Sequence, residues 1–87
     1  MGKIDNWYLY IVRCSNDSLY TGITKDINRR IDEHNIGKGA AYTRSHRPVK
    51  LVYQESYKTR SDATRREIEI KKLSKKEKEL ILERPSK

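Results

Sequence analysis

The sequence predicts an α/β fold of the α+β type, a three-stranded sheet flanked by helices in the order β-β-α-β-α-α. Aromatic and β-branched side chains alternate over residues 7–13, and a similar segment returns over 19–22, which is typical of a hairpin. Residues that commonly cap helices then begin three later segments. With 87 residues and 34% apolar side chains, the chain can form one thin core. We therefore expect a single domain over 1–87, with a core from about 7 to 83.

The hairpin decides whether two tyrosines can meet. Alternate side chains of the first strand face opposite sides of the sheet, in the sets Trp7, Leu9, Ile11 and Tyr8, Tyr10, Val12. A two-residue turn at residues 16–17 would place Tyr10 and Tyr20 on opposite faces. A shared face requires a loop of odd length or a bulge, for which Gly22 is a suitable site.

A helix and a third strand are expected to follow the hairpin. Asp26 caps a predicted helix that runs to about Asn35 and is ended by Gly37 and Gly39. A polar, basic loop over 37–47 then leads into a strand over 49–56. The pattern does not fix the direction of this strand in the sheet.

Two helices are expected to close the chain. Thr59 lies at a capping-box-like start and predicts a helix over about 60–72. Ser74 and Glu77 form a second such start, for a short helix that ends before Pro85.

The charge of the chain favours a polyanionic partner. The net charge is +8 at pH 7 and the sequence pI is about 9.7, and each phosphate that a basic protein neutralises releases condensed counterions. The alternative is a solvated basic surface that aids solubility. As nucleic-acid contacts we single out Lys38, Tyr42, Arg44, Arg47 and Lys71. The first four belong to the loop over 37–47, for which a mobile, solvated connection is an equally good interpretation.

Several protein classes are excluded by composition. The single cysteine, Cys14, cannot form an internal disulfide, and no CxxC pair offers a structural zinc site. We expect Cys14 to be a small strand residue rather than a reactive thiol. Apolar stretches are too short for a signal peptide or a membrane span. These observations favour a cytoplasmic protein with no membrane partner.

Helical periodicity separates two adjacent arginines. Ile27, Ile31 and His34 share the inward stripe of the first helix, and Arg30 borders this stripe. Arg29 points outward with Asp32 and Glu33. A half-buried arginine needs an anion, either a carboxylate or a phosphate. Taken alone, His34 is best interpreted as an interior histidine bonded to a backbone carbonyl group.

Glu67 is a similar exception in the helix over 60–72. It lies beside the inward residues Ala63 and Ile70, whereas Glu69 is predicted to face solvent. An inward carboxylate is costly unless it meets a cation, a donor or a metal ion. Periodicity leaves two interpretations equally open, a salt bridge to Arg30 and a metal ligand.

Four pieces of the sequence, in this order, resemble the GIY-YIG nuclease family. They are Tyr8-Leu9-Tyr10, Tyr20-Thr21-Gly22, Arg30 eight residues later, and Glu67. The resemblance covers about residues 7–73, and the run over 20–35 is similar to the small stand-alone and junction-cutting branches of the family. The chain departs from the family at Tyr8, where the motif has glycine, and at Ile23, where several relatives have lysine. Several relatives also have an asparagine after the glutamate, and here no asparagine follows Asn35.

The resemblance implies a role for each matching position. Tyr10 and Tyr20 would position the attacking water and help to deprotonate it, and Arg30 would steady the scissile phosphate. Glu67 would be the single carboxylate ligand of one Mg²⁺ or Mn²⁺ ion. His34 matches a family position near the nucleophile. The implied catalytic set is therefore Tyr10, Tyr20, Arg30, His34 and Glu67.

These inferences favour a metal-dependent endonuclease that hydrolyses a phosphodiester of duplex or branched DNA, in repair or recombination. One alternative is a non-catalytic nucleic-acid-binding module that keeps the fold, and another is a protein-interaction domain that modulates a partner nuclease. An inward carboxylate near phosphate favours the enzyme. A separate recognition domain is not expected within these 87 residues. A protein partner that directs the nuclease to its target is therefore an open alternative.

Overall fold

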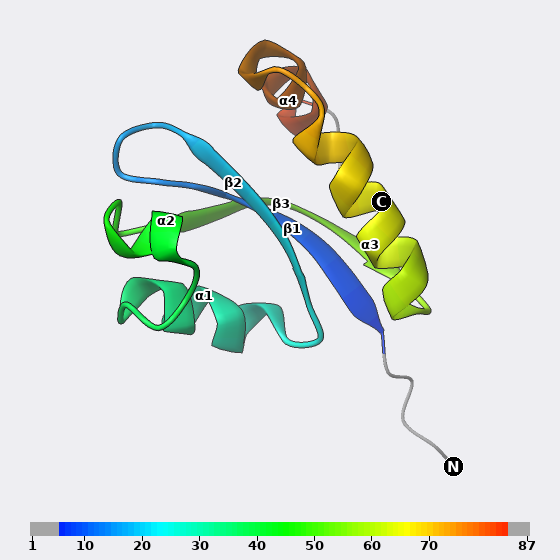
Figure 1. Ribbon diagram of the computed structural model, residues 1–87, viewed down its shortest axis with the longest axis horizontal. Coiled ribbons are helices and arrows are strands. Elements are labelled where there is room, and N and C mark those ends of the chain that lie inside the picture. Colours follow the sequence, from blue (N-terminus) through cyan, green and yellow to red (C-terminus); the bar gives the residue numbers. More distant parts are fainter. Residues whose placement is uncertain (1–5, 84–87) are drawn as a thin grey trace.

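The computed structural model describes residues 6–83, which form one sheet with helices packed around it (Figure 1). The elements in chain order are β1 (Trp7–Arg13), β2 (Leu19–Thr24), α1 (Ile27–Asn35), α2 (Ala41–Arg44), β3 (Lys50–Tyr57), α3 (Arg60–Lys71) and α4 (Lys75–Leu82). The strand order is β2-β1-β3, and β1 is antiparallel to both neighbours. The predicted α+β class and element order are confirmed, with the one-turn α2 added within the predicted loop.

The β1–β2 hairpin places Tyr10 and Tyr20 on the same face of the sheet. Residues 14–18 connect the two strands, which makes a loop of odd length. Tyr10 stands opposite Gly22, and Tyr20 stands opposite Val12. Cross-strand partners share a face, as do residues two apart on one strand, so the two tyrosines lie on one side. The irregularity in strand pairing occurs between β1 and β3 rather than at Gly22.

The two faces of the sheet carry separate apolar clusters, as the alternation in β1 predicts. On the face that α1 covers, the buried residues are Tyr10, Val12, Cys14 and Val49, joined by Tyr20, Ile27, Ile31 and Leu51. On the other face, the buried residues are Leu9, Ile11 and Ile70, and residues of β2, β3 and α4 pack against them. Figure 1 shows the sheet between α1 and α3, so the core consists of two thin layers.

Capping side chains explain where the helices begin. Asp26, Thr59 and Ser74 each accept a hydrogen bond from the backbone amide three residues further along the chain. Ser74 and Glu77 complete a capping box at α4. Gly37 follows the end of α1 with φ of +89°, a conformation that favours glycine. Within residues 6–83, no helix is long and apolar enough to cross a membrane.

Two clusters of ion pairs hold the C-terminal helices to the sheet. Both terminal nitrogens of Arg13 donate to Glu79 at 2.8 Å, which joins β1 to α4. Glu55 of β3 accepts a hydrogen bond from Nε of Arg66 at 3.0 Å and further bonds from two tyrosines of β3. This second cluster fixes α3 against the edge of the sheet formed by β3.

Candidate active site

Tyr10 lies across the backbone of β2 at a place where only glycine leaves room. Its side chain is 1% exposed and stands opposite Gly22. A Cβ atom at position 22 would lie 2.5 Å from the Tyr10 hydroxyl oxygen and 2.7 Å from its Cζ. The glycine of the 20–22 tripeptide therefore allows the Tyr10 ring to pass over β2.

A hydrogen-bonded chain joins Tyr10 to α2 through His34. The Tyr10 hydroxyl lies 2.9 Å from Nε2 of His34, and Nδ1 of His34 lies 2.7 Å from Oγ1 of Thr43. The Thr43 hydroxyl donates to the carbonyl oxygen of Ala40 at 3.0 Å. Because that bond uses the one hydroxyl proton of Thr43, Nδ1 of His34 must donate, and in a neutral ring Nε2 then accepts. We infer that His34 is the neutral Nδ1–H tautomer and that Tyr10 donates to it.

The environment of His34 agrees with a neutral ring. His34 is fully buried, and burial lowers the pKa of its imidazole, which the charge of Arg30 lowers further. Its partners are two side-chain hydroxyl groups, whereas periodicity favoured a bond to a backbone carbonyl group. The Tyr20 ring meets the His34 ring edge to face, with ring centres 5.6 Å apart.

The pKa of the Tyr10 hydroxyl is influenced by other candidate residues. Burial raises the pKa of Tyr10, hydrogen bonding to Arg30 and the charge of Arg30 lower it, and the charges of Tyr20 and Glu67 raise it. His34 is thus hydrogen-bonded to the Tyr10 hydroxyl, whereas Arg30, Tyr20 and Glu67 influence its pKa.

Arg30 extends from α1 and pairs with a carboxylate of its own helix. One terminal nitrogen of Arg30 lies 3.0 Å from Glu33, and Nε of Arg29 lies 3.3 Å from the same carboxylate. The Arg30 side chain is 31% exposed and the Arg29 side chain is 77% exposed. This agrees with the periodicity of the helix, which placed Arg30 beside the inward stripe and Arg29 on the outward side. The salt bridge between Arg30 and Glu67 that periodicity left open is not formed among residues 6–83.

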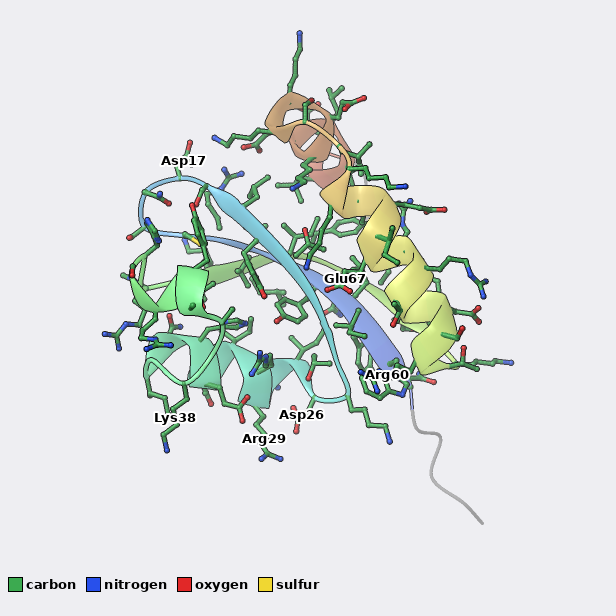
Figure 2. All side chains as sticks on the ribbon, viewed as in Figure 1. Asp17, Asp26, Arg29, Lys38, Arg60 and Glu67 are labelled. Atoms are coloured by element: carbon green, nitrogen blue, oxygen red, sulfur yellow. The ribbon has the colours of Figure 1, made fainter. Side chains whose placement is uncertain are left out.

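Glu67 points from α3 toward β2 (Figure 2). Its side chain is 20% exposed, and its Oε2 lies 3.2 Å from Nζ of Lys71, one helical turn later. The same Nζ lies 5.8 Å from the centre of the Tyr20 ring. Lys71 therefore connects the carboxylate on α3 with the tyrosine on β2.

Glu67 offers a metal ion one carboxylate rather than a cage of protein ligands. Among residues 6–83, no three His, Cys, Asp or Glu side chains are grouped as a metal site. Mg²⁺ commonly keeps several water ligands and binds through one or two carboxylates together with substrate phosphates. The residues present therefore fit a hydrated, hard divalent cation.

Tyr42 is more firmly placed than a solvated loop residue would be. Its hydroxyl donates to Oγ of Ser18 at 2.7 Å, and its ring stacks on that of His46 with ring centres 4.4 Å apart. The side chain is nevertheless 43% exposed. The α2 segment is thus a fixed turn that presents Tyr42 at the surface beside the hairpin loop.

The predicted basic contacts lie in two places. Arg47 donates to the carbonyl oxygens of Arg44 and Asn35 at 3.1 and 3.3 Å, so it closes the end of α1. Arg44 is exposed on α2, and Lys38 points away from the sheet (Figure 2). Lys71 is separate from these residues and belongs to the surroundings of Glu67.

Sequence reasoning missed two residues that orient the candidate set. Thr43, which fixes the His34 ring, is completely buried although it belongs to the predicted basic loop. Gly39 was the available signal, because a Cβ atom there would lie 2.2 Å from Nδ1 of His34. Glu33, which holds Arg30, was assigned to the outward side of the helix.

Known proteins resemble the chain over most of its length. UPF0213 proteins of Staphylococcus aureus strains Mu3 and N315 are 54% identical to it over 82 residues, which cover 93% of this chain and 100% of theirs. The solution NMR structure of the UPF0213 protein BH0048 from Bacillus halodurans has 44% identity and a TM-score of 0.59, and covers 90% of this chain and 83% of that chain. The solution NMR structure of EF2693 from E. faecalis has 41% identity and a TM-score of 0.63, and covers 95% and 88%.

The family match extends over the same elements as the candidate site. The GIY-YIG catalytic domain matches residues 6–80, from the residue before β1 to within α4. This range contains both motif tyrosines, the arginine of α1 and the glutamate of α3. The chain therefore belongs to the GIY-YIG family.

Proposed function

We propose that this protein is a metal-dependent endonuclease that hydrolyses a phosphodiester bond of DNA. Membership of the GIY-YIG family implies a nuclease-type function. The observation that carries the proposal is the Tyr10 hydroxyl, which is oriented by His34 and subject to the charges of Arg30 and Glu67. In the proposal His34 is a proton acceptor, Arg30 a phosphate ligand and Glu67 a carboxylate ligand for a metal ion, and the effects of Arg30 and Glu67 on the pKa of Tyr10 support this assignment.

Tyr10 can accept a proton from the attacking water because it can pass its own proton on. Its hydroxyl proton is directed at Nε2 of neutral His34, 2.9 Å away. As the water oxygen forms a bond to phosphorus, the proton of the water moves to Tyr10 and the proton of Tyr10 moves to Nε2. The bond to the leaving oxygen breaks, and this oxygen takes up a proton from solvent. Tyr20, beside the His34 ring, helps to position the water.

Arg30 binds the phosphate on which negative charge develops. Its side chain is 31% exposed, so a phosphate can reach it from the pocket at the N-terminal end of α1. Glu33 holds the guanidinium in place before substrate binds. Because an arginine presents several donors in a fixed plane, it can bind two phosphate oxygens while it keeps this contact.

Glu67 is the residue that would hold a divalent ion, Mg²⁺ or Mn²⁺, through its one carboxylate. Such an ion would supply positive charge to offset the negative charge on the leaving oxygen. In the protein alone, Lys71 supplies the counter-charge of Glu67 at 3.2 Å. The Lys71 side chain is 49% exposed and can turn toward solvent or a phosphate, which leaves the carboxylate for the ion.

The charge of the protein supports DNA as the substrate. The net charge of +8 favours a polyanion. The exposed side chains of Lys38, Arg44 and Arg47 contact phosphates outside the catalytic pocket.

Nicking of supercoiled plasmid tests the proposal. We expect the wild type to nick DNA with Mn²⁺ or Mg²⁺, and Glu67→Gln and Arg30→Ala to lower the rate by about 10²- to 10³-fold, as loss of one charge-stabilising group does. Binding to Glu67→Gln should be retained or stronger, because a negative charge near phosphate is removed. Arg29→Ala is the matched control on α1, since its side chain is 77% exposed at the outer side of the pocket, and it should cut nearly normally apart from some loss of affinity.

The opposite outcome is equally clear. The wild type, tested with both metal ions on plasmid, branched DNA and RNA, could fail to cut above the Glu67→Gln background. The chain would then be a nucleic-acid-binding module with a nuclease fold, and the enzymatic proposal would be rejected.

A further inference from the structure

One end of the sheet gathers cations that the proposed chemistry does not use. Lys25 precedes α1 and Arg60 begins α3, and both helices start at the end of the sheet where β1 begins (Figure 1). Nζ of Lys25 lies 5.6 Å from the centre of the Trp7 ring, and Cζ of Arg60 lies 5.5 Å from it. One tryptophan therefore holds two cations that come from separate segments of the chain.

Trp7 and Lys25 also line the pocket that contains Arg30. This open pocket has a volume of about 360 Å³, and its charged and aromatic lining residues are Trp7, Lys25, Asp26, Arg29, Arg30 and Glu33. The two carboxylates are already engaged, Asp26 by the cap of α1 and Glu33 by the two arginines. The pocket thus keeps an excess of positive charge.

Lys25 and Arg60 have no carboxylate partner within the part of the chain that the structure describes. Both side chains are exposed. A cation in the first turn of a helix is also disfavoured by the helix dipole, so Arg60 does not stabilise α3 by its charge. An anion from outside the chain would satisfy both residues.

We propose that Lys25 and Arg60, positioned by Trp7, bind backbone phosphates of the strand that is cut, next to the phosphate bound by Arg30. This inference rests on the proposed function for the role of Arg30. Because Lys25 and Arg30 line one pocket, the phosphates they bind belong to neighbouring nucleotides. The strand leaves the catalytic site across the end of the sheet toward α3, on the opposite side from α2.

The salt dependence of DNA binding tests this path. In a Glu67→Gln background, which separates binding from cleavage, we compare a labelled duplex bound by Lys25→Ala/Arg60→Ala and by Lys50→Ala/Lys76→Ala. The control pair removes the same charge from exposed residues at the start of β3 and in α4. The first pair should reduce the slope of log K against log salt by about 0.9 to 1.8, according to whether the two cations share a phosphate. The control pair should leave it nearly unchanged.

Trp7 supplies an independent optical readout because it is the only tryptophan of the sequence. Binding of the duplex should change its fluorescence emission in the Glu67→Gln protein, and this change should be much smaller in the variant that lacks Lys25 and Arg60. Trp7→Leu keeps both charges but removes the ring that holds them, so it should weaken binding. Trp7→Phe, which keeps an aromatic face, should restore part of the loss.

The outcomes separate this inference from the proposed function. An unchanged slope in the Lys25/Arg60 variant, or equal losses in the control pair, would overturn the phosphate path even if the wild type cuts DNA. A smaller slope confined to the Lys25/Arg60 variant would support the path even if no cleavage occurs.

Discussion

Gly22 and Thr21 are neighbours on β2 and face opposite sides of the sheet. Gly22 lies beneath Tyr10, where a Cβ atom would be 2.5 Å from the hydroxyl oxygen. Tyr10 is buried, with 1% of its surface exposed. We expect Gly22→Ala to lower the free energy of unfolding by about 1–3 kcal/mol, as overpacking does, and to shift the Tyr10 hydroxyl away from His34. Urea denaturation measures the first effect, and the cleavage rate should fall with the second.

Thr21 is the matched position on the other face. It stands opposite Ile11, and its buried hydroxyl has no hydrogen-bond partner among residues 6–83. Thr21→Val keeps the shape and removes this unsatisfied group, so we expect the free energy of unfolding to rise by about 1 kcal/mol. Cleavage should not change, since the side chain points away from Tyr10. A loss of stability would show that the hydroxyl has a partner in solution, such as a bound water.

His34 should make stability depend on pH. Its pKa is lowered by burial, so below about pH 6.5 the unfolded chain binds a proton that the folded chain does not. The free energy of unfolding therefore falls as the pH is lowered through this window, and the contribution of His34 is fully retained above it. Urea midpoints at about pH 7.5 and about pH 5.5 should differ in the wild type. His34→Gln should reduce the difference, whereas His46→Gln, which removes the other histidine, should preserve it.

At the scale of elements, α3 carries Glu67, and Arg66, the residue before Glu67, fixes this helix to the sheet. Arg66 is bonded to Glu55, with exposures of 31% and 16%. Arg66→Met keeps the apolar stem but leaves Glu55 without its cation, which should cost about 1–3 kcal/mol. Cleavage should slow as well, because Glu67 depends on the position of α3.

Arg65 is the control for this prediction. Arg65 directly precedes Arg66 in α3, its side chain is 70% exposed, and it pairs with Asp62. Arg65→Met should change the free energy of unfolding by no more than about 0.5 kcal/mol. Equal effects of the two substitutions would mean that general charge, rather than the bond to Glu55, holds α3.

At the scale of the whole molecule, Arg44 of α2 and Arg47 just after it should both affect DNA binding, but only one of them should affect stability. Arg44 is exposed, whereas Arg47 donates to carbonyl oxygens at the end of α1. We expect each change to Ala to reduce the salt slope of DNA binding by about 0.9. Only Arg47→Ala should also lower the melting temperature, because those carbonyl oxygens lose their donor. Binding that does not vary with salt would contradict the nucleic-acid interpretation of this surface.

Local spacing predicted most of the fold because it sets the side to which a residue points. Alternation in β1 and the stripe of α1 placed Tyr10, Arg30 and His34 correctly. Spacing gives a direction but no distance, so it could not decide that Arg30 pairs with Glu33 rather than Glu67. Spacing did not single out Thr43, since its contact with His34 depends on how a loop folds back over α1, and Gly39 was the one sign of a close approach there.

The contact between Thr43 and His34 also bears on how the molecule responds to what it binds. Tyr42 and Thr43 are adjacent on the one-turn α2, with Tyr42 at the surface and Thr43 buried against the His34 ring. Because α2 is only one turn long, a displacement of Tyr42 should also move Thr43. Under the proposed function, a DNA strand that contacts Tyr42 would therefore also act on Thr43 and on the His34 ring that accepts the Tyr10 proton. Substrate contact at the surface and proton transfer at the buried site would then depend on each other.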